Sequence, residues 1–245
     1  MTTRAVRPSR LRVALVSVAA AAALLLAGCS TTVYDPPATS RPTSSRDAVP
    51  GSELPTAAVI GDSIAIGLGV PATDAWPLIA AARLGWNLTD FAESGAGFTR
   101  PGVNSHRFDD QVSAVIRLRP QIVIVAATIN DAATAQTAPG TVITATRAAI
   151  DRMATALPDT TIIGMGAVWG ATAAPAVARV MDDALKGAVL GVGGHWLSIG
   201  QTFLGRADLM QPDGIHPNTA GQALLGEAVS DAIAKAEIRP RPASG

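Results

Sequence analysis

The stretch Gln121-Ile122-Val123-Ile124-Val125-Ala126-Ala127 predicts a β-strand and decides the fold class of this chain. It is rich in β-branched residues, which favour strands. Every side chain after Gln121 is apolar, so the strand is expected to turn neither face to water. Strands that are buried on both faces are typical of parallel sheets covered by helices on either side.

Other apolar runs on both sides of this strand alternate with segments of helical spacing. Short apolar runs predict further strands at 57–60, 86–91, 161–165 and 195–199. Apolar residues recur at helical spacing over 112–116, 143–153, 177–189 and 225–233. This alternation predicts a three-layer α/β/α domain with a mainly parallel sheet of about five strands and right-handed crossovers. In such sheets, ligands bind beyond the carboxyl ends of the strands.

The first 28 residues have the features of a bacterial secretory leader. Several arginines precede an apolar run from Val13 to Ala27, and no acidic residue occurs before position 29. This run is too short to cross a bilayer comfortably but suits the core of a signal peptide. The sequence Leu26-Ala27-Gly28-Cys29 resembles a lipobox, which implies cleavage before Cys29 and a lipid on its thiol. The alternatives are an uncleaved membrane anchor and a chance buried cysteine.

The sequence predicts four parts. Residues 1–28 form a lipoprotein signal peptide, and residues 29–56 contain the lipidated cysteine and a flexible linker rich in Thr, Ser and Pro. Residues 57–236 form the folded domain, and residues 237–245 form a flexible tail. The lipid would hold the domain at the extracytoplasmic face of the bacterial cell membrane. Because the chain has a single cysteine, no disulfide can form within it.

The charge balance does not favour nucleic-acid binding. The full chain carries 19 basic and 19 acidic residues. Loss of the leader, with its arginines at positions 4, 7, 10 and 12, leaves 15 basic residues against 19 acidic ones. A mildly acidic domain lacks the basic patch that binds phosphate backbones. Hydrophobic residues make up 48% of the chain and are sufficient for a sizeable core.

Polar or glycine-rich segments follow the first three predicted strands. Gly61-Asp62-Ser63 follows the first, where a serine hydroxyl is exposed and backbone N–H groups can face an oxyanion. Gly95-Ala96-Gly97 lies after the second, and its glycines allow a close approach of the backbone to a ligand. Asn130-Asp131 follows the third. Each segment taken alone is also compatible with an ordinary turn.

A carboxylate and an imidazole stand three residues apart in Asp213-Gly214-Ile215-His216, just before the last predicted helix. At this spacing Asp213 can fix the tautomer of His216 and stabilise its protonated form, as a general base requires. The chain has only three histidines. His106 lies in a polar loop and His195 begins a predicted strand, so both are interpreted as structural.

These four segments occur in an order that resembles the SGNH hydrolases, also called GDSL lipases and esterases. The resemblance extends over most of the chain, from about residue 57 to 236, and implies a flavodoxin-like sheet. It implies that Ser63 is the nucleophile and that Asp213 orients His216 as the base. It further implies an oxyanion hole made by the backbone N–H groups of Ser63 and Gly95 and by the side-chain amide of Asn130. No metal and no cofactor is required.

Two positions are ambiguous with respect to this family. The third block usually reads Gly-x-Asn-Asp, and Thr128 stands where the glycine is expected. A β-branched residue there is expected to narrow the pocket beside the amide donor. Gly97 could supply the backbone N–H in place of Gly95, although the Ser-Gly step at Gly95 fits the family better. Asp62 and Asp131 are interpreted as residues that hold their turns.

The predicted function is hydrolysis of acyl esters through an acyl-enzyme on Ser63, which water splits in a second step. The substrate could be a small-molecule ester, a lipid or an acylated glycan. Two alternatives stay open, namely acyl transfer to an envelope glycan or lipid acceptor, and a non-catalytic binding lipoprotein. Fold alone does not choose among them. Four aromatic residues could line the pocket or simply pack in the core: Trp76, Trp86, Phe98 and Trp169.

Overall fold

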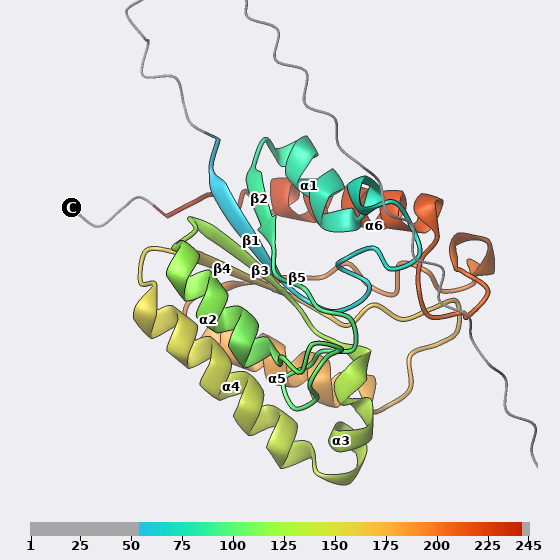
Figure 1. Cartoon of the computed structure of the whole chain (residues 1–245), viewed down its shortest axis with the longest axis horizontal. Coiled ribbons are helices and arrows are strands. Elements are labelled where there is room, and N and C mark those ends of the chain that lie inside the picture. Colours follow the sequence, from blue (N-terminus) through green and yellow to red (C-terminus); the bar gives the residue numbers. More distant parts are fainter. Residues whose placement is uncertain (1–53, 242–245) are drawn as a thin grey trace, which may run out of the picture. The chain divides into compact units, whose positions relative to one another are not determined.

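The computed structural model describes residues 54–241, which form a five-stranded sheet flanked by helices (Figure 1). All neighbouring strands are parallel, in the order β2-β1-β3-β4-β5. This architecture confirms the predicted three-layer α/β/α domain. The strands are β1 (Thr56–Ile60), β2 (Asn87–Asp90), β3 (Ile122–Ala126), β4 (Thr161–Met165) and β5 (His195–Leu197).

Most of the predictions about the two ends of the chain lie outside the described residues. These are the signal peptide at 1–28, the lipid on Cys29, the linker as far as residue 53, and residues 242–245 of the tail. Across residues 54–241, no helix combines the length and the apolar character needed to cross a membrane.

The central strands are buried because they are apolar at nearly every position. All five residues of β3 and all five of β4 are buried. Alternate side chains of β3 point to opposite faces, so Ile122 and Ile124 belong to one hydrophobic cluster while Val123 and Val125 belong to the other. The sheet therefore separates two hydrophobic layers, and each layer needs a cover of helices.

Helices cover both faces of the sheet. On one face lie α1 (Trp76–Leu84) and α6 (Thr219–Lys235), and on the other lie α2 (Phe108–Leu118), α4 (Pro139–Ala156) and α5 (Ala178–Gly191) (Figure 1). The two hydrophobic clusters follow the same division, since α6 contributes to the first and α2, α4 and α5 to the second. The connections contain α3 (Ala132–Thr137) and 3-10 turns at Ala72–Asp74, Ile129–Asp131 and Ala207–Leu209.

The sequence pattern did not predict helix α1. Its residues, WPLIAAARL, are apolar almost throughout and show no polar face from which a helical period could be recognised. Trp76 at its start is 1% exposed and belongs to the core, where it lines a small cavity of about 10 Å³ together with Asp62 and Ile64. Helices α1 and α6 pack so closely that a Cβ on Gly226 of α6 would lie 2.8 Å from Cβ of Ile79 on α1.

The folded domain extends beyond its predicted end at residue 236. Ile238 is 3% exposed and joins the hydrophobic cluster beneath α6. Thr161 Oγ1 on β4 donates to Arg239 O and accepts from Arg241 N. The Arg241 guanidinium also donates to Gly193 O at 2.6 Å. The first part of the predicted flexible tail, 237–241, is therefore packed on the domain.

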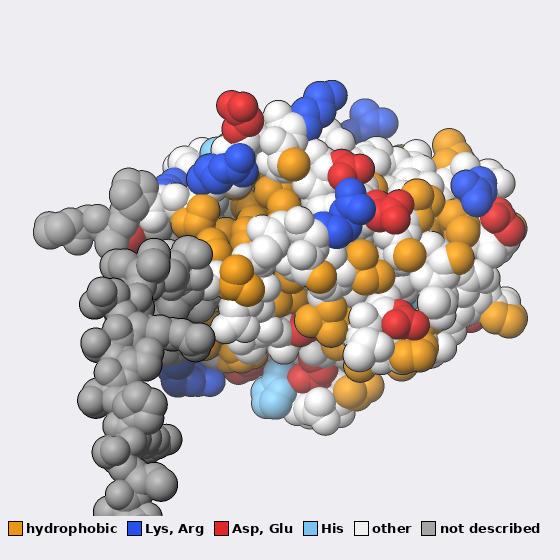
Figure 2. All heavy atoms as spheres, turned by 90° about the horizontal axis from the view of Figure 1, so that it is seen from above, with side chains coloured by type: hydrophobic (Ala, Val, Ile, Leu, Met, Phe, Trp, Pro, Cys, Tyr) orange, Lys and Arg blue, Asp and Glu red, His pale blue; other side chains and the backbone are white. Residues whose placement is uncertain are grey.

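The exposed surface mixes side chains of different kinds. Figure 2 shows one face, on which acidic and basic side chains lie among one another and among hydrophobic ones. Several of the described ion pairs join neighbouring exposed groups of opposite sign, for example Arg83 with Asp231 at 2.7 Å. Such exposed pairs contribute little to stability.

Candidate active site

Ser63 and His216, which are 153 residues apart in the chain, lie within hydrogen-bond distance at the carboxyl ends of the strands. Ser63 follows β1 and is 8% exposed. Its Oγ lies 2.9 Å from Nε2 of His216. On the other side of the ring, Nδ1 of His216 lies 2.6 Å from Oδ2 of Asp213. The structure thus brings the three predicted residues into one hydrogen-bonded row.

The turn around Asp213 explains the direction of these hydrogen bonds. Its Oδ1 accepts from the backbone N–H groups of Ile215 at 2.9 Å and His216 at 3.0 Å. The hydrogen bond from the His216 ring, followed by these backbone bonds, lowers the pKa of Asp213 to about 2. An ionised carboxylate only accepts, so Nδ1 of His216 carries the proton and Nε2 is left to accept from the Ser63 hydroxyl.

The loop that carries His216 is held from both sides. Met210 and Pro217 form an antiparallel bridge, and Gln211 N donates to His216 O at 2.8 Å. The Gln211 side chain donates to Leu68 O at 2.6 Å, which ties this loop to the segment that follows Ser63. These contacts fix the spacing between the serine and the imidazole.

In the segment after β2, the backbone N–H of Gly95 is free, whereas that of Gly97 is not. Gly97 N donates to Arg100 O at 2.9 Å, so that N–H is already used. Within residues 54–241, neither Gly95 N nor Ser63 N donates to a backbone or side-chain acceptor. Gly95 has φ +78°, a conformation that favours glycine. Both N–H groups are therefore available to a ligand.

Asp131 holds the neighbouring turn after β2, whereas the sequence suggested that it holds its own turn. It is 1% exposed, and its carboxylate accepts from Phe98 N at 2.8 Å and from the backbone and hydroxyl of Thr99. A Cβ on Gly97 would lie 2.7 Å from Oδ1 of Asp131. The close approach of this buried carboxylate thus requires glycine at position 97.

Asp62, Thr128 and Asn130 form a connected group beside the serine. Thr128 Oγ1 donates to Asp62 Oδ2 at 2.5 Å and accepts from Asn130 N at 3.1 Å. Asn130 Nδ2 donates to Ala96 O at 3.0 Å and to Asp62 Oδ2 at 3.3 Å. Thr128 is 2% exposed and its hydroxyl is directed at Asp62 Oδ2, so the hydroxyl is engaged inside the protein.

Asp62 is a buried carboxylate next to the serine. Burial raises its pKa above the ordinary value, although hydrogen bonds from the Thr128 hydroxyl and from Ile64 N oppose this effect. The position is consistent with a residue that holds the turn around Ser63, because Oδ1 of Asp62 accepts from Ile64 N at 2.9 Å.

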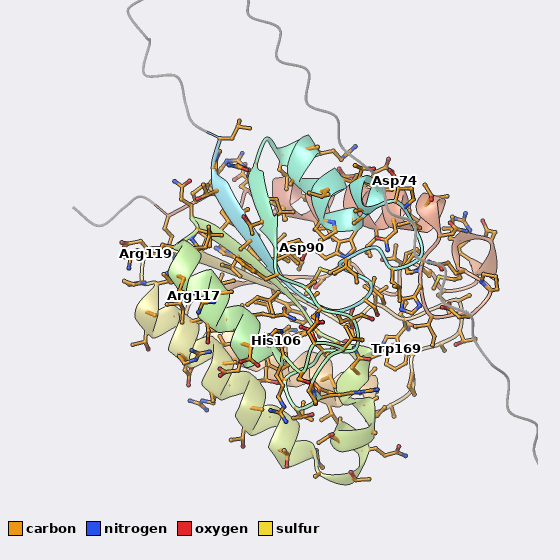
Figure 3. All side chains as sticks on the ribbon, viewed as in Figure 1. Asp74, Asp90, His106, Arg117, Arg119 and Trp169 are labelled. Atoms are coloured by element: carbon orange, nitrogen blue, oxygen red, sulfur yellow. The ribbon has the colours of Figure 1, made fainter. Side chains whose placement is uncertain are left out.

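The other two histidines lie away from this row. His106 Nδ1 lies 2.8 Å from Oε2 of Glu93, whose other oxygen accepts from Asn104 N at 2.6 Å. This pair closes the loop that begins at Ser94, a role that the sequence did not reveal because no regular spacing links the two residues. His195 is exposed at the start of β5. Figure 3 shows His106 beside the amino end of α2.

Among the four candidate aromatic residues, Trp169 and Trp76 line cavities, and the one at Trp76 is small, about 10 Å³. Phe98 is 7% exposed and packs edge-on against Phe108, and Trp86 packs against the core. Trp169 borders a cavity of about 460 Å³ beyond β4 and β5, which Trp196 also lines. Figure 3 shows Trp169 on the side of the domain where the strands end. None of the three residues of the hydrogen-bonded row lines this cavity.

A serine, a histidine and an aspartate linked in this way are typical of serine hydrolases. Residues 59–224 match the GDSL-like lipase/acylhydrolase family, and the chain belongs to this family. It is similar to the GDSL lipase Rv0518 of Mycobacterium tuberculosis, with 26% identity over 191 residues that cover 72% of this chain and 80% of that protein.

Two solved structures illustrate the range of proteins with this fold. The psychrotrophic esterase EstA from Pseudoalteromonas sp. has a TM-score of 0.60 and 18% identity, over 75% of this chain and 98% of that one. The salicylyl-acyltransferase SsfX3 from a tetracycline biosynthetic pathway has a TM-score of 0.60 and 17% identity, over 78% of this chain and 57% of that one. At such identities these likenesses support the fold alone.

Proposed function

We propose that the protein is a serine ester hydrolase that works through an acyl-enzyme on Ser63. The observation that carries this proposal is the row of hydrogen bonds from Ser63 Oγ to His216 and from His216 to Asp213. Membership of a lipase and acylhydrolase family supports hydrolase chemistry in general. The substrate class is a carboxylic ester, carried by a small molecule, a lipid or a glycan.

The geometry supports a two-step reaction. Nε2 of His216 takes the proton of the Ser63 hydroxyl as Oγ attacks the ester carbonyl carbon, and a tetrahedral intermediate forms. The imidazolium, stabilised by Asp213, then donates that proton to the leaving alkoxide, and the alcohol departs. Water enters, gives a proton to His216 and attacks the acyl carbon. The imidazolium then returns the proton to Ser63 Oγ as the bond from Oγ to the acyl carbon breaks, which releases the carboxylic acid and restores the serine.

The oxyanion of each tetrahedral intermediate is assigned to the donors around Ser63. The free N–H groups of Ser63 and Gly95 are two of them, and the Asn130 amide is the third. Losing one such donor typically slows an enzyme by about 10²–10³-fold. The roles of Asp62 and Asp131 in this proposal are to hold the turns that aim these donors.

The proposal is tested with the full chain purified in detergent. We expect hydrolysis of p-nitrophenyl esters by the wild type, with the chain-length optimum between acetyl and palmitoyl defining the acyl group. Ser63→Ala and His216→Ala are each expected to abolish turnover while remaining folded, and a fluorophosphonate should label Ser63. Turnover that survives Ser63→Ala would exclude the acyl-enzyme.

Acyl transfer is a second candidate, because an acyltransferase shares this fold. The same acyl-enzyme would give its acyl group to an alcohol in place of water. A fluorophosphonate-labelled Ser63 without hydrolysis, together with an ester product whose yield depends on an added glycan or lipid alcohol, would favour transfer. Absence of both labelling and turnover would favour a non-catalytic binding lipoprotein.

We also propose that a lipid on Cys29 anchors the protein at the extracytoplasmic face of the bacterial cell membrane. The support is the lipobox-like sequence after an apolar run. Metabolic labelling with palmitate should mark the wild type, and Cys29→Ala should lose the label and leave the membrane fraction. A wild type that takes up no palmitate label and still stays in the membrane fraction would indicate an uncleaved anchor.

A further inference from the structure

Thr128 is a buried side chain that joins two turns of the candidate active site. It precedes the 3-10 turn Ile129–Asp131, and its Oγ1 accepts from Asn130 N at 3.1 Å. The same oxygen donates to Asp62 Oδ2 at 2.5 Å, across 66 positions of the chain. Thr128 therefore contacts both the turn that carries the nucleophile and the turn that carries the amide donor.

Asp62 Oδ2 receives two side-chain donors at unequal distances. The Thr128 hydroxyl lies at 2.5 Å and the Asn130 amide nitrogen at 3.3 Å. Because hydrogen bonds weaken as they lengthen, Thr128 supplies the stronger of the two. A buried carboxylate oxygen without a hydrogen-bond donor raises the free energy of the protein. Because the Thr128 hydroxyl remains as a donor to Asp62 Oδ2, the Asn130 amide can break its own bond to that oxygen at a lower free-energy cost.

The Asn130 amide has two N–H groups, and both face protein acceptors. One donates to Ala96 O at 3.0 Å and the other to Asp62 Oδ2 at 3.3 Å. To stabilise an oxyanion, the amide must give up one of these bonds, and the longer bond to Asp62 is the weaker one. When the amide turns from Asp62 Oδ2 to the oxyanion, Asp62 Oδ2 still accepts a hydrogen bond from the Thr128 hydroxyl.

We propose that Thr128 is a positioning residue that keeps one N–H of Asn130 available to the oxyanion by satisfying Asp62 Oδ2 in its place. This inference rests on the proposed hydrolase function. It gives a role to the side chain that stands where the family usually has glycine. It also accounts for the burial of Thr128, since the hydroxyl is used inward and not against a substrate.

The test compares Thr128→Val, which removes the hydroxyl at nearly constant shape, with Thr128→Ser, which keeps it. In Thr128→Val, the Asn130 amide is left as the side-chain donor to Asp62 Oδ2 among the described residues. If the amide then turned to the oxyanion, this buried oxygen would have no side-chain donor. We expect kcat and kcat/KM for p-nitrophenyl acetate to fall together by about tenfold, with KM within about twofold. Thr128→Ser is expected to stay within about threefold of the wild type, because it retains the hydrogen bond.

Thr146→Val is the matched control. Thr146 lies on α4, is 1% exposed, and its Oγ1 has no hydrogen-bond partner among the described residues. The same chemical change there should leave kcat and KM unchanged. Thermal unfolding of all variants separates a loss of folded protein from a loss of rate. If Thr128→Val does not fold, Thr128→Ala replaces it in the comparison.

A double-mutant cycle with Asn130→Ala decides whether Thr128 acts through the amide. If it does, removing the Thr128 hydroxyl should have no further effect on kcat in the Asn130→Ala background, although it lowers kcat in the wild type. Equal effects in the two backgrounds would overturn the inference. A wild-type kcat in Thr128→Val, or an equal loss in Thr128→Ser, would overturn it as well.

The failure of this inference can be distinguished from failure of the proposed function. If the wild type hydrolyses esters, Ser63→Ala does not, and Thr128→Val matches the wild type, only the role of Thr128 is rejected. If the folded wild type shows neither turnover nor labelling of Ser63, the hydrolase proposal itself fails, and the role of Thr128 fails with it.

Discussion

Asp213 receives three hydrogen bonds within one short turn, and the shortest joins its Oδ2 to Nδ1 of His216 at 2.6 Å. The two backbone bonds to Oδ1 hold the carboxylate in the orientation in which its Oδ2 meets the imidazole. The acid and the base both lie on this turn, and the hydrogen bond from the Gln211 side chain to Leu68 O holds the turn beside the segment that follows Ser63.

Replacing Asp213 by asparagine should place the wrong tautomer at His216. An asparagine amide can donate to Nδ1, which moves the ring proton to Nε2 and removes the acceptor that faces Ser63. We expect kcat/KM for p-nitrophenyl esters to fall by about 10³-fold or more, with little change in KM. Asp183→Asn, an exposed change on α5, should be silent. A decrease of less than tenfold in Asp213→Asn would show that the carboxylate does not set the tautomer.

The stability contributed by Asp213 should disappear in acid. Its pKa is lowered from 3.8 to about 2 in the folded state, so the ionised form stabilises the fold above pH 3.8 and this stabilisation fades as the pH falls toward 2. The difference in unfolding free energy between the wild type and Asp213→Asn should shrink over that interval. It should also shrink with added salt, because the side chain is 45% exposed. A difference that grows on acidification would contradict the assignment.

The fold could be predicted from sequence where burial is uniform along an element. Strands β3 and β4 are buried at every position and apolar at every position but Thr161, so their sequences are typical of a parallel sheet. Helix α1 escaped prediction for a related reason. It is apolar nearly all round, and a pattern without a polar face cannot be assigned to a helix rather than to another buried segment.

The candidate site could be predicted in so far as its contacts are local. Asp213 and His216 lie three positions apart, and the sequence alone suggests their hydrogen bond. The direction of the Thr128 hydroxyl could not be predicted, because its partner Asp62 is 66 positions away. The structure places that side chain against Asp62, where the sequence suggested only that it narrows the pocket.

Removing the Asn130 side chain should impair the transition state and not substrate binding. Its amide, on the 3-10 turn after β3, donates to Asp62, the residue that precedes Ser63, and is the third donor assigned to the proposed oxyanion. We expect Asn130→Ala to lower kcat by about 10²–10³-fold with KM changed by less than about threefold. Asn87→Ala on the exposed face of β2 serves as the control. A change confined to KM would assign Asn130 to substrate binding.

Gly97→Ala should damage the site through Asp131. The added Cβ would lie 2.7 Å from Oδ1 of a buried carboxylate that holds Phe98 N and Thr99 N, so the loop after β2 must shift. We expect a loss of about 1–3 kcal/mol in unfolding free energy, together with reduced turnover.

Gly140→Ala on α4 is the matched control for Gly97→Ala. A Cβ at Gly140 meets no atom within 4 Å, and alanine is the better helix former. This variant should be unchanged or more stable by up to about 1 kcal/mol. Denaturant titration and ester kinetics measure both effects. Equal behaviour of the two variants would show that the contact between Gly97 and Asp131 does not constrain the loop that presents Gly95.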